Sequence, residues 1–401
     1  MAPYNETSAN DYTPADVNVP VSMLEYFAPA PKGETLLSQY RLLSPSAGVR
    51  VSPLCLGAMS LGDQWSPFMG GKDMGLKESM EFLDVFYELG GNFIDTANNY
   101  QDEQSEFIVG EWMKARGNRD DIVLATKYTS PYKIRKEGRY PGIGVNYIGN
   151  SKKSLKHSVE DSLRKLQTDY IDLLYVHWWD HSTDIPELMQ SLNDLVRSGK
   201  VLYLGISDTP AWIVSAANEY ARAHGLAQFV VFQGLWNLKE RDIERDIIPM
   251  CRKYGMALAP WGVIGQGKFK TPEQIKEAKA LRGNTQPTEA EIKASEALAE
   301  VAAEIGNGAS IAAVAMAWTR SKMAYCIPII GGTKVSHLRQ NARDLSITLT
   351  AEQIAKLEAA CPFDHGFPTG RFGRDPHYLP NGKPESIFVN VAGDVKFVTG
   401  P

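Results

Sequence analysis

The sequence predicts an α/β fold, a closed (β/α)8 TIM barrel, on three observations. Eight short apolar segments alternate with segments of helical periodicity over most of the 401 residues. The strand-like segments are apolar almost throughout, which is typical of a parallel sheet buried on both faces. The first of them leads into GAMSLG at residues 57–62, which does not match the G-x-G-x-x-G turn of an open doubly wound sheet. Eight units in roughly 300 residues therefore favour the closed barrel.

The eight expected units follow one another from about residue 40. Strands are expected where β-branched and aliphatic residues run together, as in IVLATK at 122–127. Helices are expected where apolar residues recur every three or four positions, as in 151–166. In order, the expected strand and helix pairs are 53–57 with 77–89, 92–95 with 104–115, 122–127 with 151–166, 171–177 with 185–198, 201–207 with 211–223, 228–233 with 240–254, 256–260 with 288–305 and its continuation 311–321, and 325–330 with a closing helix from Val335.

Three parts are expected along the chain. Residues 1–35, rich in Pro, Asn, Asp and Ser, predict an extended N-terminal arm; residues 36–360 form the barrel domain, and residues 361–401 form a tail dense in Gly, Pro and aromatic residues. We expect the tail to fold across the barrel mouth and close its pocket, with a solvated tail as the alternative. Long insertions at 130–150 and 265–287 follow the third and seventh strands, where such loops usually cover a site.

Composition narrows the class of partner and the compartment. A net charge of −5 argues against nucleic acid or an anionic membrane, and the apolar run 308–319 is too short to span a bilayer. The four cysteines are far apart and form no C-x-x-C pair, so neither a metal site nor a disulfide framework is expected. The first twenty residues carry acids and prolines where a signal peptide needs basic and then apolar residues. We therefore expect a cytoplasmic protein, either a monomer or a homodimer.

Polar side chains end several of the expected strands. The carboxyl ends of barrel strands share one rim, and that rim is where such folds build their sites. In strand order the residues at these ends are Asp95, Lys127, His177, Ser207 with Asp208, and Gln233, while the seventh strand leads into Trp261. Tyr100 follows Asp95 in a polar loop. Each residue alone is more often a solvated edge or a structural group, but their arrival on one rim predicts a site.

Four of these residues suit the protonation of a carbonyl oxygen. The pKa of a free phenol is about 10, and a neighbouring ammonium lowers it. We therefore expect Lys127 to tune Tyr100, with Asp95 holding the ammonium in place, and His177 to orient and polarise the carbonyl through an N–H. The sequence has no G-x-S-x-G elbow and no cysteine at an expected rim position, so a covalent nucleophile is not indicated.

The chain resembles the aldo-keto reductases. The motifs that carry the resemblance are NFIDTAxxY at 92–100, ATK at 125–127 and VH at 176–177. Within that superfamily the chain is similar to the fungal aryl-alcohol dehydrogenases, through the tail CPFDHGFP and the insertion GKFKTPEQIKEAKALRGN. The similarity runs from about residue 40 to the C-terminus. It implies an NADPH-dependent reduction of aldehydes, with Tyr100 as general acid, Lys127 and Asp95 tuning it, and His177 placing the carbonyl.

The resemblance also implies which residues hold the nicotinamide. Ser207, Asp208 and Gln233 match the residues that bind its amide, and Trp261 matches the aromatic residue stacked beneath the ring. The family usually has G-x-S-N where this chain has GISD at 205–208. A carboxylate accepts a hydrogen bond from the carboxamide NH2 but cannot donate one to its carbonyl, so Asp208 departs from the family pattern in a way that bears on cofactor binding.

The loops after strands seven and eight are where barrels commonly bind phosphate. The first loop supplies glycines and a cation, and the second opens a helix whose N-terminus attracts anions, although an ordinary solvated loop or helix start is the alternative. The expected phosphate-binding residues are Gly262, Gly265, Gly267, Lys268, Gly331, Gly332, Thr333, Lys334, His337, Gln340 and Asn341. Lys334, with His337 or Arg339, would meet a 2′-phosphate, and no acid stands ready for a free ribose hydroxyl, so NADP(H) is expected rather than NAD(H).

Aromatic residues follow several strand ends and predict a flat, apolar pocket for an aromatic ring. They are Trp65, Phe68, Tyr128, Trp178, Trp179 and Trp236, of which Trp65, Tyr128 and Trp178 are the expected substrate contacts. The expected function is the reversible reduction of aromatic aldehydes to the corresponding alcohols with NADPH. The alternatives are reduction of another carbonyl such as a polyketide ketone, a non-catalytic NADP-binding regulatory subunit, and a lyase or isomerase that uses Lys127 as a Schiff base.

Overall fold

The computed structural model describes residues 27–28, 30–71, 74–133, 142–271, 274, 285–379 and 381–398. The chain divides into two units, residues 1–33 and residues 34–401, and the second is described below. Most of the expected N-terminal arm lies outside the described residues. Residues 134–141, 272–273 and 275–284, which belong to the two expected insertions, also lie outside them.

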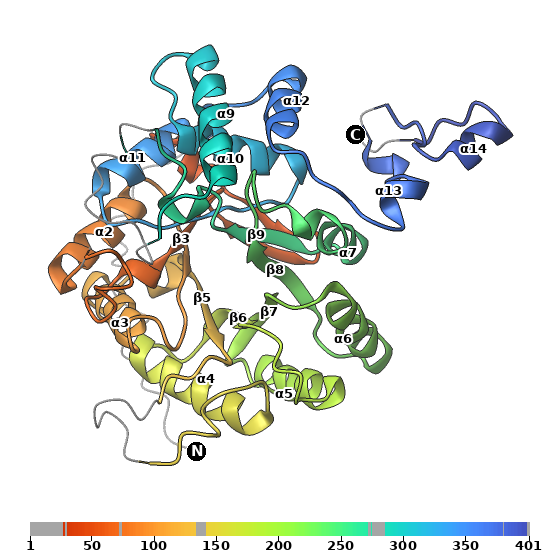
Figure 1. The fold of residues 1–401 in the computed structure, drawn as a ribbon. Coiled ribbons are helices and arrows are strands. Elements are labelled where there is room, and N and C mark those ends of the chain that lie inside the picture. The colour runs from red at the N-terminus through yellow and green to blue at the C-terminus, as the bar shows by residue number, and fades with distance from the viewer. Residues whose placement is uncertain are drawn as a thin grey trace. The chain divides into compact units, whose positions relative to one another are not determined.

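Eight parallel strands form the sheet predicted from the sequence, in the order β10-β3-β4-β5-β6-β7-β8-β9 (Figure 1). The strands are β3 (Cys55–Gly57), β4 (Phe93–Asp95), β5 (Val123–Tyr128), β6 (Ile171–Val176), β7 (Val201–Ser207), β8 (Phe229–Leu235), β9 (Ala257–Trp261) and β10 (Ile329–Ile330). A parallel bridge between Leu258 in β9 and Cys326, just before β10, brings the two edges of the sheet together. The prediction of a (β/α)8 barrel is therefore confirmed.

Helices cover the outside of the sheet (Figure 1), and all but α12, which follows the expected closing helix, lie at expected places. They are α2 (Leu76–Glu88), α3 (Gln104–Arg116), α4 (Lys152–Leu166), α5 (Ile185–Arg197), α6 (Ala211–His224), α7 (Ile247–Tyr254), α9 (Glu289–Ile305), α10 (Ile311–Lys322), α11 (Val335–Arg343) and α12 (Ala351–Ala360). One expected helix, 240–254, is instead the short 3-10 helix η5 (Asp242–Glu244) followed by α7. Pro249 stands in the first turn of α7, and because proline has no N–H to donate, the helix cannot extend far ahead of it. None of the described helices has the length and hydropathy needed to cross a membrane.

A β-hairpin that the sequence analysis did not predict precedes the barrel. Its strands are β1 (Arg41–Ser44) and β2 (Ala47–Val51), which pair in antiparallel fashion. Its Leu43 and Val51 are fully buried and belong to the same apolar cluster as Phe93 and Val123, which point into the barrel from the first positions of β4 and β5. The hairpin therefore fills the amino end of the barrel and leaves the carboxyl ends of the strands for the site.

The C-terminal tail contains two short helices, α13 (Thr369–Phe372) and α14 (Ile387–Ala392). Near its start, Arg245 Nη2 donates to the carbonyl oxygen of Asp364 at 2.9 Å. Further on, the guanidinium of Arg252 in α7 lies 4.0 Å from the ring centroid of Tyr378. These contacts anchor the tail to η5 and α7. Closure of the barrel mouth by the tail stays a prediction.

Candidate active site at the carboxyl end of the barrel

A buried ammonium group organises the site. Lys127 Nζ donates to Asp95 Oδ2 at 2.6 Å, to the carbonyl oxygen of Thr96 at 2.8 Å and to the Tyr100 hydroxyl oxygen at 3.1 Å. Asp95 ends β4 and pairs in register with Ala125 in β5, which places its carboxylate beside the next inward-facing residue, Lys127. The three acceptors match the three protons of an ammonium. Because the Tyr100 hydroxyl oxygen accepts a hydrogen bond from Lys127, the hydroxyl proton of Tyr100 points away from the Lys127 ammonium.

Burial dominates the acid–base properties of this cluster. Desolvation raises the pKa of Tyr100 above its usual value, and Lys127 offsets only part of that rise. Lys127 does lower the pKa of Tyr100, as expected, but the net shift of that pKa is upward because burial has the larger effect. Burial lowers the pKa of Lys127, but Asp95 and Tyr100 raise it by more, so the net shift is upward. At neutral pH the site therefore holds an ammonium ion and a protonated phenol.

His177 faces the Tyr100 ring edge-on, with 5.8 Å between the ring centroids. Burial, followed by the charge of Lys127, holds the pKa of His177 well below its usual value, so the ring is neutral. Ser130 Oγ lies 3.1 Å from His177 Nδ1 and accepts a hydrogen bond from Trp178 Nε1 at 3.1 Å. Ser130 Oγ accepts from the indole and still has its own proton to donate, for which Nδ1 of the neutral His177 ring is an acceptor within reach. We therefore expect the ring proton of His177 at Nε2, where it is available as a donor.

The residues expected to hold a nicotinamide lie on the neighbouring strands. Gln233 in β8 donates from Nε2 to Asp95 Oδ1 at 3.0 Å, so Asp95 accepts hydrogen bonds from both Lys127 and Gln233. Ser207 Oγ, at the end of β7, is buried and has no partner of hydrogen-bond geometry among the described residues. Asp208 follows with a left-handed backbone (φ 42°), and its carboxylate accepts from Trp261 Nε1 at 3.3 Å.

A left-handed turn, residues 101–103, fixes Tyr100 against the pocket wall. Gln101, Asp102 and Glu103 all have positive φ angles (53°, 51° and 80°), which costs a non-glycine residue roughly 1 kcal/mol or more each. Each side chain of the turn is held. Gln101 accepts from the backbone N–H of Trp65 at 2.8 Å, Asp102 accepts from Trp65 Nε1 at 2.9 Å, and Glu103 pairs with Lys133 at 2.7 Å. The Trp65 ring in turn contacts Tyr100 edge-on, with 6.2 Å between the ring centroids.

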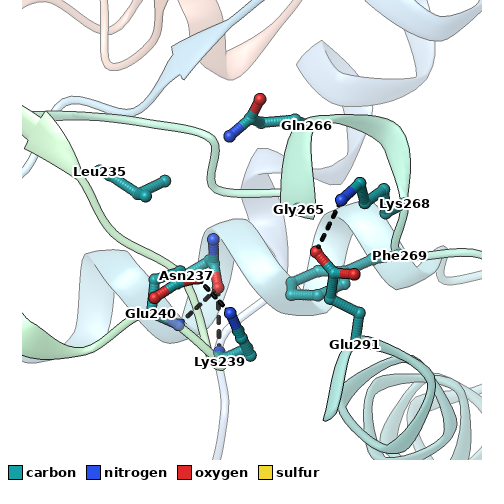
Figure 2. A pocket seen from close by; sticks show the side chains of 9 residues that line it. All are labelled: Leu235, Asn237, Lys239, Glu240, Gly265, Gln266, Lys268, Phe269 and Glu291. Atoms are coloured by element: carbon teal, nitrogen blue, oxygen red, sulfur yellow. Dashed lines mark hydrogen bonds and ion pairs between the residues drawn. The ribbon is translucent and has the colours of Figure 1, made fainter. Parts of the chain in front are cut away.

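The first expected phosphate loop follows β9. Gly262, Gly265 and Gly267 all have positive φ angles, and a Cβ at Gly262 would meet Leu235 at 2.7 Å. Figure 2 shows the pocket beside this loop, in which Lys268 Nζ lies 3.2 Å from Glu291 Oε1. Lys268 therefore has a carboxylate partner that a phosphate would have to replace.

The second loop leads into α11. Lys334 is the exposed N-cap of this helix, and Gly332 lies close to the barrel, where its carbonyl oxygen accepts from Ser60 Oγ at 2.7 Å. Gln340 donates to Asp344 Oδ1 at 2.8 Å within the helix, and Asn341 is buried. Thus Lys334 presents its charge to solvent, whereas Gln340 and Asn341 serve the packing of the helix in this structure.

The expected aromatic wall is only partly assembled. Trp65 and Trp178 lie with Tyr100 and His177, and Phe68 extends the wall, 6.2 Å from Trp65 between ring centroids. Tyr128 lies elsewhere: it is buried in the layer between the sheet and the helices, and its hydroxyl donates to the carbonyl oxygen of Asn150. Side chains alternate along a strand, so Lys127 faces the barrel interior and Tyr128 the opposite side. The expected substrate contact at Tyr128 is therefore replaced by a structural role.

A second buried ion pair, which the sequence analysis did not find, supports the loop that carries Tyr100. Lys165 Nζ lies 2.7 Å from Glu106 Oε2 and donates to the carbonyl oxygen of Asn98 at 3.1 Å, while Thr126 Oγ1 donates to Glu106 Oε1 at 2.6 Å. Both charged side chains are fully buried. A signal for this pair was present, because Lys165 follows Leu155, Val159 and Ser162 on the apolar stripe of α4.

Comparison with known proteins gives one matching family and relatives of two kinds. The sequence model of the Aldo/keto reductase family matches residues 53–361. The chain is 54% identical to a putative aryl-alcohol dehydrogenase of Saccharomyces cerevisiae, over 88% of this chain and 95% of that protein. It is 50% identical to an NADP(+) aryl-alcohol dehydrogenase of Phanerodontia chrysosporium, over 88% and 94%. It is 52% identical to norsolorinic acid reductase B of Dothistroma septosporum, over 82% and 83%. The family match spans the strand ends that form the site.

Proposed function

This chain belongs to the aldo/keto reductase family, and we propose that it reduces aromatic aldehydes reversibly to the corresponding alcohols, as an aryl-alcohol dehydrogenase. It is an oxidoreductase, and NADP(H) is its cofactor. The observation that carries the proposal is the contact of Tyr100 with both the buried Lys127 ammonium and the His177 ring. The named aryl-alcohol dehydrogenase relatives support the substrate class.

The residues at the ends of β7 to β9 fit the cofactor. The buried Ser207 hydroxyl has no partner of full hydrogen-bond geometry among the described residues, which suits a polar group of a ligand, and the glycines of the loop after β9 allow close backbone approach. Ser207, Gln233 and Trp261 would hold the nicotinamide, and Lys268 with Lys334 would hold the phosphates. When bound, NADPH supplies a hydride for the carbonyl carbon.

In this mechanism the protein supplies the proton and positions the carbonyl. His177 donates through Nε2 to the carbonyl oxygen, and the Tyr100 hydroxyl protonates that oxygen as negative charge develops on it. Lys127 stabilises the resulting phenolate, and Asp95 keeps the ammonium charged and in place. For alcohol oxidation the same groups act in reverse, with Tyr100 accepting the proton. The edges of Trp65 and Trp178 would flank the substrate ring.

The test is Tyr100→Phe, which removes the proton donor and keeps the ring. We expect kcat for NADPH oxidation with benzaldehyde-type substrates to fall by roughly 100-fold or more. Tyr87→Phe is the matched control, because the Tyr87 hydroxyl donates to Asp121 on the surface, at 2.7 Å. Survival of kcat within a few-fold in Tyr100→Phe would overturn the assignment.

A second substrate class has one observation in its favour, the 52% identity to norsolorinic acid reductase B. The same proton donor would serve a ketone, such as that of a polyketide, since the chemistry at the oxygen is unchanged. A panel of aryl aldehydes and aryl ketones, assayed with NADPH and NADH in parallel, separates the two. Higher kcat/KM for a polycyclic ketone than for every aldehyde would favour the second class. A cytoplasmic location and the oligomeric state stay predictions.

A further inference from the structure

Asp208 occupies an unusual position at the end of β7. Its backbone is left-handed, and its N–H donates to the carbonyl oxygen of Gln233 at 3.1 Å. Solvent reaches part of the residue, but enough protein surrounds the carboxyl group for burial to raise its pKa. The carboxylate accepts a hydrogen bond, at 3.3 Å, from the neutral indole of Trp261. The buried hydroxyl of the preceding Ser207 has no partner of full hydrogen-bond geometry among the described residues, and it lies near enough to Asp208 to help lower the pKa of that carboxyl group. The carboxylate thus stands beside the place that would receive the polar end of a nicotinamide.

The surrounding charges single out Asp208. Asp95 is neutralised by Lys127 at 2.6 Å, and His177 is uncharged. Asp208 lies within electrostatic range of Tyr100 and Lys127, so it belongs to the same site, but its hydrogen-bond partner is uncharged. Among the described residues at the ends of β4 to β9, Asp208 is therefore a carboxylate without a cation in contact with it.

We propose that Asp208 makes the site discriminate between the two redox states of its cofactor, favouring NADP+ over NADPH. The oxidised nicotinamide ring carries a positive charge, whereas the reduced ring is neutral. A carboxylate accepts from the carboxamide NH2 equally in both states, so that hydrogen bond does not discriminate. The Coulomb attraction to the ring exists only in the oxidised state, and it therefore changes the ratio of the two affinities. An asparagine at this position has no such effect.

The proposal has a pH signature. Desolvation raises the pKa of Asp208 to about 6, against the opposing effects of the Trp261 hydrogen bond, the charge of Lys127 and the Ser207 hydroxyl. The pKa values of Tyr100 and Lys127 are raised and that of His177 is lowered, so these three keep their charge between about pH 5.5 and pH 8. The preference for NADP+ should accordingly be present near pH 8 and weaken as the pH falls through about 6.

The experiment measures the dissociation constants of NADP+ and NADPH for the wild-type protein and Asp208→Asn by titration calorimetry. The quantity compared is the ratio Kd(NADPH)/Kd(NADP+), in which the titration of the 2′-phosphate, common to both forms, cancels. At about pH 8 we expect this ratio to be roughly three- to tenfold lower in Asp208→Asn. At about pH 5.5 the wild-type ratio should approach that of the variant. No carbonyl substrate is present, so the result is independent of the proposed reaction.

Asn tolerates a positive φ better than other residues, so Asp208→Asn keeps the backbone that the position requires. Asp169→Asn is the matched control: it removes one exposed negative charge ahead of β6, at the opposite end of the strands, and should leave the ratio unchanged. Equal ratios for the wild type and Asp208→Asn at pH 8 would overturn the proposal. Should Asp208→Asn fail to fold, Asp208→Gly removes the same charge, tolerates a positive φ and is judged by the same ratio.

Discussion

Replacement of Asp95 by Asn tests how the buried charges of the site are balanced. Asp95 accepts from Lys127 through Oδ2 at 2.6 Å and from Gln233 through Oδ1 at 3.0 Å, whereas Asn has only one oxygen. In Asp95→Asn the side-chain NH2 therefore points at a donor, either Lys127 Nζ or Gln233 Nε2. The substitution also removes the negative charge that balances the ammonium. The side chains of Lys127 and Asp95 are 0% and 4% exposed, so water does not replace the lost partner.

The expected cost follows from this burial. Breaking a buried ion pair by removing one partner costs about 3–5 kcal/mol of the free energy of unfolding, because the other charge stays buried without compensation. In the wild type the pKa of Lys127 is raised, so its contribution to stability is present below the unfolded pKa of about 10.4 and is lost as pH rises through the folded value. In Asp95→Asn the upward effect of the Asp95 charge is gone and burial, the largest effect, lowers the pKa of Lys127, so the variant gains stability from neutral towards alkaline pH. The difference between the two proteins should therefore narrow as pH rises.

Urea unfolding, followed by far-UV circular dichroism at about pH 7 and pH 9.5, measures both effects. Asp194→Asn is the matched control, since its pair with Lys152 is 63% and 66% exposed at the side chains and should contribute at most about 1 kcal/mol. A loss in Asp95→Asn no larger than in the control, or a difference that does not change with pH, would refute this account of the charge balance.

Three further predictions concern the groups around the proton donor. Ser130→Ala should lower kcat for carbonyl reduction about three- to tenfold and remove the Nε2–H preference of His177 in 15N NMR spectra, while Ser130→Thr retains both; unchanged spectra would contradict the assigned tautomer. Lys165→Met should lower the free energy of unfolding by about 3–5 kcal/mol, because Glu106 is left buried without its partner. Adding Glu106→Leu should restore much of that free energy. A double variant no more stable than Lys165→Met would show that the loss of stability does not come from the broken ion pair. Because burial raises the pKa of Tyr100, the rate of hydride transfer in the reduction direction should stay constant from neutral pH to about pH 9 and fall only above about pH 10. Stopped-flow kinetics measure this rate. A fall centred near neutral pH would exclude Tyr100 as the general acid.

The barrel and the central contacts of the site could be predicted because they follow from local rules. Asp95 and Lys127 end adjacent parallel strands, and strand ends of a barrel meet on one rim whatever the loops do. Lys127 and Asp95 could therefore be placed on the same rim from the strand ends that they occupy. The net rise of the Tyr100 pKa could not be predicted, since it depends on the degree of burial, which the sequence does not state.

The misses share a physical reason: they concern side chains whose partners come from distant segments. Tyr128 was assigned to the pocket from its place after Lys127, although strand alternation turns it outward. Ser130 gained its role only through Trp178 and His177, which are far from it in the sequence. The hairpin β1–β2 was missed because it is short and carries few β-branched residues, so that packing at the amino end of the barrel decides its structure.

The left-handed turn at 101–103 couples the position of Trp65 in the pocket wall to the position of the proton donor Tyr100. Asp102 holds the indole N–H of Trp65 and Gln101 its backbone N–H, and the same turn sets where Tyr100 stands. A smaller residue at position 65 would keep the backbone contact, but it would release Asp102 as well as enlarge the pocket. An engineer who wants to admit bulkier substrates should therefore begin at Phe68, one ring further out, and leave the tryptophan untouched.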